Sequence, residues 1–191
     1  MQPMEERTTA EVIETLGNDV DRCHGLLIEA FDQGVADDKG CLDADYEFAA
    51  RQLVRAIFAY IEAVTFSVKV KAAGWCLENE IDLSDGERFL SVDVEHVLNN
   101  KGEVVERQAR LSLAENIRFA LSLLEKSMGQ SNGFDASVEW WACLKASIRV
   151  RDRLTHPRMP EDIDISGDEI VTALKAYSGF SKHLASQPAD S

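Results

Sequence analysis

The spacing of apolar residues along the chain predicts a mostly helical protein. Two long segments carry apolar residues at alternating intervals of three and four, which is the spacing of one helix face. In the first segment, about residues 8–34, these positions are Ile13, Leu16, Val20, Cys23, Leu27 and Ala30. In the second, about residues 45–77, they are Ala50, Val54, Ile57, Ile61, Val64 and Val68. Two such helices joined by a loop are expected to pack antiparallel.

Between about residues 88 and 111 the helical spacing gives way to alternation. Apolar residues recur at every second position over 90–98, the polar segment 99–102 follows, and a second run extends over 105–111. This arrangement is typical of a β-hairpin. A hairpin alone is marginally stable in water, so we expect it to pack on the helices or on another chain. His96 lies on the apolar side of its strand, which favours a packed residue over a ligand-binding one.

Three more helices are predicted beyond the hairpin. Capping boxes, a serine with a glutamate three residues later, begin at Ser112 and Ser166 and predict helices over 112–128 and 166–185. Between them a helix is expected over 136–156, with Trp141, Leu144 and Ile148 facing the core. It ends near His156 because a residue before proline disfavours helical backbone. The sequence therefore predicts a single all-α domain over 1–191, a bundle of about five helices with an inserted hairpin.

Composition adds no cofactor, metal or membrane segment to this picture. The chain has 191 residues, 45% apolar and 28% charged, which suits one domain with a sizeable core. Arg55 and Glu62 interrupt the longest apolar stretch, and the first residues lack a signal-peptide pattern, so we expect a cytoplasmic protein. The four cysteines are scattered without paired spacing, and the acidic cluster over 37–47 lacks the spacing of an EF-hand.

The charge of the chain is distributed unevenly. The net charge of −14 argues against a protein that coats nucleic acid without sequence preference, because such binding depends on Lys and Arg. The window from residue 145 to residue 158, however, contains five basic residues and one acidic residue. The five are Lys145, Arg149, Arg151, Arg153 and Arg158. Cations complement the dipole at a helix C-terminus, which accounts for one or two of them.

This basic window contains the candidate chemistry of the chain. Arg151, Asp152 and His156 place a fixed positive charge, a carboxylate and an imidazole within about one and a half helical turns. Cleavage of an RNA phosphodiester without a metal needs a cation for the phosphate, an acid or base that works near neutral pH, and a group that orients it. Glu62, Arg149 and Arg153 are supporting candidates. Glu62, between apolar residues of the second helix, is expected to be buried and to pair with Arg149 or Arg151.

These residues resemble the HEPN superfamily. Its motif is an arginine followed by Asn, Asp or His and then, after a short interval, by a histidine near the end of a late helix in an all-α bundle. Arg151, Asp152 and His156 match it, whereas Arg149 is followed by Val150. The segments ARQLVRAIFAYIEAVTF and ENIRFAL are similar to those of uncharacterised bacterial members, so the resemblance covers about 45–157.

The resemblance implies a metal-independent endoribonuclease whose active site forms in the cleft of a homodimer. In that role Arg151 holds the phosphate, His156 transfers protons and Asp152 orients either partner. A toxin or defence effector with a cognate regulatory or antitoxin protein is one expectation, although Arg158 stands where members with a nucleotidyltransferase antitoxin have tyrosine. The alternative is a catalytically silent dimerisation or regulatory module, in which Arg151 and Asp152 form an interface ion pair.

Overall fold

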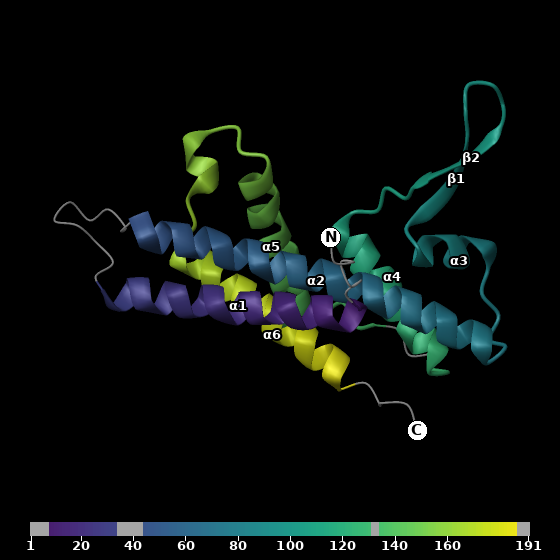
Figure 1. Ribbon diagram of the computed structural model, residues 1–191, viewed down its shortest axis with the longest axis horizontal. Coiled ribbons are helices and arrows are strands. Elements are labelled where there is room, and N and C mark those ends of the chain that lie inside the picture. The colour runs from purple at the N-terminus through teal and green to yellow at the C-terminus, as the bar shows by residue number, and fades with distance from the viewer. Residues whose placement is uncertain (1–7, 34–43, 131–133, 187–191) are drawn as a thin grey trace, which may run out of the picture. The chain divides into compact units, whose positions relative to one another are not determined.

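The computed structural model describes residues 8–33, 44–130 and 134–186. These residues form six α-helices, a two-stranded antiparallel hairpin and a short 3-10 helix (Figure 1). The helices are α1 (Thr9–Asp32), α2 (Ala44–Glu78), α3 (Asp85–Ser91), α4 (Leu113–Ser127), α5 (Glu139–Thr155) and α6 (Gly167–Ala185). The strands are β1 (Val94–Leu98) and β2 (Val104–Gln108), and the 3-10 helix is η1 (Pro160–Ile163). The mostly helical content confirms the expected fold class.

The chain divides into two compact units. The first comprises Met1–Ile61 with Ala136–Ser191, and the second comprises Glu62–Asp135. Helix α2 contributes its first half to one unit and its second half to the other. That the two units form one domain over 1–191 stays a prediction.

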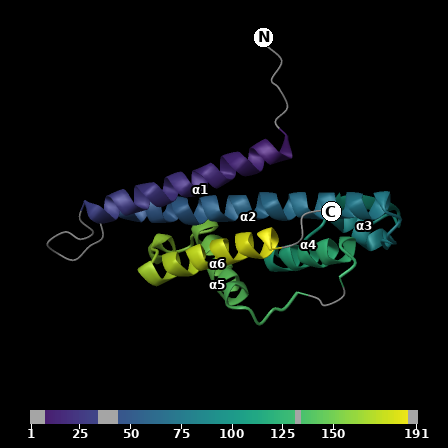
Figure 2. The ribbon, with the colours of Figure 1, turned by 90° about the horizontal axis from the view of Figure 1, so that it is seen from below.

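In the first unit, α1 runs alongside the first half of α2 in the opposite direction (Figures 1 and 2). The apolar stripe predicted for α1 is confirmed, because all six of its residues are buried or half-buried. The predicted stripe of α2 is also buried or half-buried, but α2 buries a wider face than that stripe. The additional core residues of its first half are Tyr46, Ala49, Leu53 and Phe58. Gly34, the last residue of the first predicted segment, lies outside the described residues.

The pair formed by α5 and α6 carries the motif. The buried face of α5 consists of Trp141, Leu144, Ser147, Val150 and Leu154. Trp141 and Leu144 face the core as predicted, whereas Ile148 is only half-buried, because the turn of the helix places Ser147, Val150 and Leu154 in the core instead. The facing residues of α6 are Ile170, Ala173, Ala176 and Phe180. The start predicted for α5 at residue 136 was early, since the helix begins at Glu139.

The second unit contains a short helix that the spacing did not predict. Ser84 accepts from the backbone of Glu87 at 3.3 Å, and the Glu87 carboxylate accepts from the Ser84 backbone at 2.8 Å. This capping box begins α3, so the segment 88–91, predicted as strand, is helical. The Glu87 carboxylate also accepts from Lys126 of α4 at 2.9 Å, and this bond lowers the Glu87 pKa.

The hairpin itself is confirmed, with shorter strands than predicted. Val94 pairs with Gln108 and Leu98 with Val104, and all five residues of β2 are exposed. Within the unit β1 lies against α3, where the His96 ring is 4.1 Å from the Phe89 ring. Lys69 of α2 is fully buried and forms an ion pair with Asp93, the residue before β1.

Candidate functional site

The motif lies in the last turn of α5. The His156 amide donates to the Asp152 carbonyl at 3.0 Å, which closes the helix, and the Thr155 hydroxyl donates to the Arg151 carbonyl at 2.8 Å. His156 is the C-terminal cap, with φ −130° and ψ 59°, and Pro157 follows. A proline ring disfavours helical backbone in the residue before it, so the helix ends where the sequence predicted. The cap leaves the His156 side chain exposed to solvent.

Within the motif, the arginine and the aspartate interact with each other. Arg151 Nη1 donates to Asp152 Oδ1 at 3.1 Å, and the Arg151 side chain is half-buried whereas that of Asp152 is exposed. Asp152 and His156 are four residues apart, about one helical turn. Among the described residues the bond between these two is the backbone one, and Asp152 accepts from Arg151 instead.

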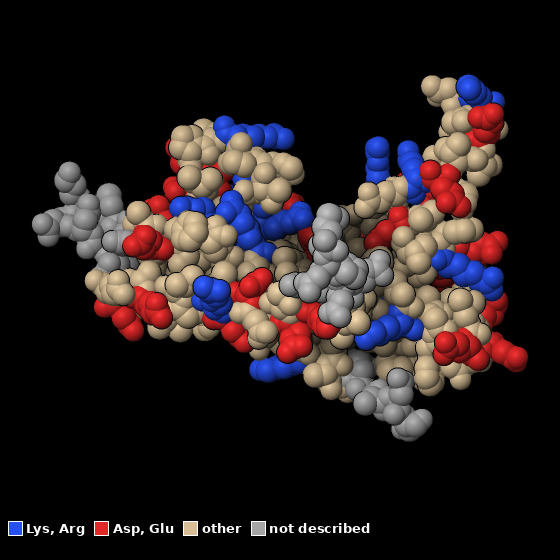
Figure 3. All heavy atoms as spheres, in the orientation of Figure 1, with Lys and Arg blue, Asp and Glu red and all other residues tan. Residues whose placement is uncertain are grey.

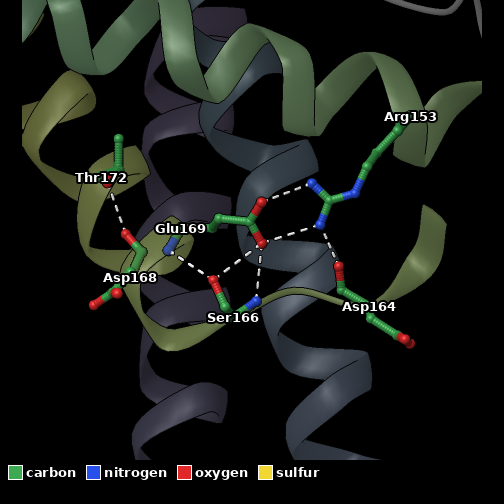
Figure 4. Close-up of polar contacts among 6 residues, drawn as sticks. All are labelled: Arg153, Asp164, Ser166, Asp168, Glu169 and Thr172. Carbon is green, nitrogen blue, oxygen red and sulfur yellow. Dashed lines mark hydrogen bonds and ion pairs between the residues drawn. The ribbon is translucent and has the colours of Figure 1, made fainter. Parts of the chain in front are cut away.

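Arg153 lies on another side of α5, where it binds α6. Its guanidinium binds both oxygens of Glu169 in α6, with Nη1 to Oε1 at 2.8 Å and Nη2 to Oε2 at 3.0 Å, and Nη2 also donates to the Asp164 carbonyl (Figure 4). The same carboxylate accepts from the backbone and hydroxyl of Ser166, the N-cap of α6 (Figure 4). Arg153 lowers the pKa of Glu169 because it stabilises the carboxylate. The end of α5 is thereby tied to the start of α6.

The connection after the motif is held by a second carboxylate. Asp162, in η1, accepts hydrogen bonds from the backbone amides of Arg158 and Met159 at 2.7 Å and 2.9 Å. These two bonds lower the pKa of Asp162. Asp162 thus holds the backbone of Arg158 and Met159, and Arg153 holds the chain at Asp164.

The remaining candidates are distributed as follows. Arg149 is exposed on α5, three residues before Asp152 and seven before His156, so these three lie near one helix face. Glu62 was expected to be buried, and this was wrong because it is exposed. It belongs to the second unit, and its pairing with Arg149 or Arg151 stays a prediction.

One residue near the motif was missed by the sequence analysis. Arg55 of α2 donates from Nη2 to the Leu154 carbonyl at 3.5 Å, two residues before His156. The two residues are 99 positions apart, so no local spacing indicates the contact. The available signal was an arginine that interrupts an apolar helix. In Figure 3, Lys and Arg side chains gather over the first half of α2 on the face that is shown.

The described residues contain no group of three or more His, Cys, Asp or Glu side chains arranged to hold a metal ion. Cys41 and three residues of the acidic cluster, Asp37, Asp38 and Asp43, lie outside the described part of the chain. No helix within the described ranges combines the length and the apolar character that a membrane crossing requires. Comparisons with protein-family models, curated proteins and solved structures find no match to this chain.

Proposed function

We propose that this protein is a metal-independent endoribonuclease of HEPN type that works as a homodimer in the cytoplasm. The proposal includes an antiparallel bundle of about five long helices, α1, α2, α4, α5 and α6, with α3 and the hairpin inserted between α2 and α4. A role as toxin or defence effector, with a cognate regulatory protein, belongs to the same proposal.

The observation that supports it is the position of His156. Its imidazole is exposed at the end of α5, one turn after an arginine and an aspartate that contact each other. Histidine side chains titrate near neutral pH, so His156 would take the proton of a ribose 2′-hydroxyl or return one to the leaving 5′-oxygen. Arg151 would bind the phosphate and offset the charge that develops on it. The products would be a 2′,3′-cyclic phosphate and a 5′-hydroxyl.

The reaction uses both a base and an acid, whereas each motif supplies one histidine. Two-fold symmetry brings the same surface of two chains together, and a second His156 would then supply the missing group. Dimerisation is therefore part of the proposed mechanism, and activity should depend on protein concentration.

The test is incubation of mixed cellular RNA with the purified protein in EDTA, followed by a denaturing gel. We expect cleavage by the wild type and its loss in His156→Ala and Arg151→Ala at equal dimer content. Matched controls remove the same groups elsewhere: Arg118→Ala, an exposed arginine of α4, and His24→Ala in α1 should cleave as the wild type does. Cleavage that survives in His156→Ala would contradict the assignment.

The ion pair between Arg151 and Asp152 favours a second candidate, the catalytically silent dimerisation or regulatory module. In that case the 3.1 Å contact belongs to an interface, and His156 is a cation at a helix end. Intact RNA in every lane, from protein that is folded and dimeric, would support this candidate. Arg151→Ala should then weaken the dimer measured by sedimentation.

A further inference from the structure

A groove runs between α1 and α2 in the first unit. Its volume is about 460 Å³, and it lies between two helices of the same unit. Apolar side chains from both helices line it, including Cys23, Leu26 and Phe48. Its polar lining includes Arg22 of α1 with Gln52 and Arg55 of α2. We call it the α1–α2 groove.

The groove is connected to the motif by Arg55. This side chain lines the groove and also donates to the Leu154 carbonyl at the end of α5. A guanidinium has five N–H donors, so one contact with a carbonyl leaves donors for a further acceptor. Arg55 therefore belongs to the groove and also contacts the end of α5, two residues before His156.

The side chains of the groove suit a single-stranded nucleic acid. Phe48 is 53% exposed, and an exposed aromatic ring offers a surface on which a base can stack. Arg22 and Arg55 would bind phosphates, and the Gln52 amide can donate to or accept from a base edge. Asp19 lines the same groove, so two cations face one carboxylate. That small surplus of positive charge fits a short single strand better than a duplex, whose phosphates are more closely spaced.

We propose that the α1–α2 groove binds the single-stranded RNA nucleotides next to the phosphate that the motif cleaves, with a base on Phe48 and phosphates on Arg22 and Arg55. The inference rests on the proposed ribonuclease function, because it takes the bound molecule to be the substrate. It assigns to this chain a preference for unpaired RNA.

The binding test uses a fluorescent 2′-O-methyl RNA oligonucleotide of mixed sequence, which cannot be cleaved because its 2′-hydroxyls are blocked. Stacking on an aromatic ring contributes about 1–3 kcal/mol per base, so Phe48→Ala should weaken binding by about 5- to 150-fold in anisotropy. Arg22→Gln should weaken binding for all sequences. It should also reduce the slope of log K against log salt concentration by about 1, which corresponds to one phosphate contact. The controls are Phe66→Ala and Arg118→Gln, which remove exposed side chains of the other unit and should bind as the wild type does.

The outcomes separate the groove from the catalytic proposal. Cleavage that depends on His156 but is unchanged in Phe48→Ala and Arg22→Gln would overturn the groove and leave the ribonuclease standing. Oligonucleotide binding that depends on Phe48, without cleavage of any RNA, would support the groove and contradict the catalysis. Unchanged RNA binding with a lower dimer content in Phe48→Ala would assign the groove to a second copy of the chain and overturn the inference.

Discussion

The ion pair between Arg153 and Glu169 gives the sharpest stability prediction. The pair is bidentate, and its side chains are 26% and 33% exposed. Hydrogen bonds to charged groups contribute about 1.5–3 kcal/mol each, and partial exposure to solvent reduces this. We therefore expect a coupling free energy of about 1–2 kcal/mol from a double-mutant cycle of Arg153→Ala and Glu169→Ala. Glu169→Ala alone should be more destabilising than Arg153→Ala, because it also removes the capping box of Ser166.

A second ion pair between the same two helices provides the control. Lys175 of α6 binds Glu139 of α5 at 2.9 Å, but these side chains are 57% and 76% exposed. Exposed pairs contribute roughly 0–1 kcal/mol, so the cycle of Lys175→Ala and Glu139→Ala should give a coupling near the bottom of that range. Both cycles are measured by urea unfolding followed by circular dichroism, and a constant m value shows that the variants unfold in the same way.

The coupling of Arg153 with Glu169 should also depend on pH. Because the folded protein lowers the Glu169 pKa below its ordinary value, the carboxylate contributes stability that is fully present at neutral pH. This contribution is lost as the pH falls through the lowered pKa, where the folded protein takes up the proton. The cycle should therefore give a smaller coupling at acid pH than at pH 7.

Two results would refute this account of the pair. A coupling of zero within error at pH 7 would mean that solvent screens the contact completely. Equal couplings for the partly buried pair and the exposed pair would mean that burial does not set the magnitude. A zero coupling would leave the capping box, and not Arg153, as what holds the start of α6.

Two further predictions concern packing and a buried charge. A Cβ at Gly179 would clash with Trp140 Cβ, so Gly179→Ala should lower the free energy of unfolding by about 1–3 kcal/mol. Gly74 lies inside α2 with open space around it, so Gly74→Ala should raise the free energy of unfolding by about 0.5–1 kcal/mol through the higher helix propensity of alanine. Thermal unfolding checks both, and equal melting temperatures would contradict the packing argument. Lys69→Met leaves Asp93 without its cation and should cost about 3 kcal/mol in urea unfolding. A neutral effect there would show that solvent satisfies Asp93.

The helices were predictable where local chemistry determines them. The capping boxes at Ser112 and Ser166 mark the starts of α4 and α6, and Pro157 marks the end of α5. The same rule would have found α3, because Ser84 and Glu87 have the same spacing. The alternation that suggested a strand over 90–92 outweighed it. A helix of seven residues shows too few turns for its period to be distinguished from alternation.

The phase of α5 was mispredicted for a different reason. Ser147 is fully buried, but a serine reads as polar, so the stripe was drawn through Ile148. A shift of one position turns the helix by about 100°, so Ile148 was assigned to the core in place of Ser147. The contacts of Arg55 with Leu154 and of Arg153 with Glu169 join distant segments. Such contacts depend on the packed fold, and no spacing along the chain encodes them.

The three arginines at alternate positions of α5 now have distinct environments. Arg153 is held by Glu169, so its removal should affect activity through the position of the helix end. Arg149 and His156 share an exposed face and lie seven residues, about 10 Å, apart along the axis. Arg151 lies on another side of the helix, and its guanidinium donates to Asp152 at 3.1 Å. A phosphate would therefore bind Arg151 by competing with Asp152, so the aspartate would position the arginine until substrate arrives.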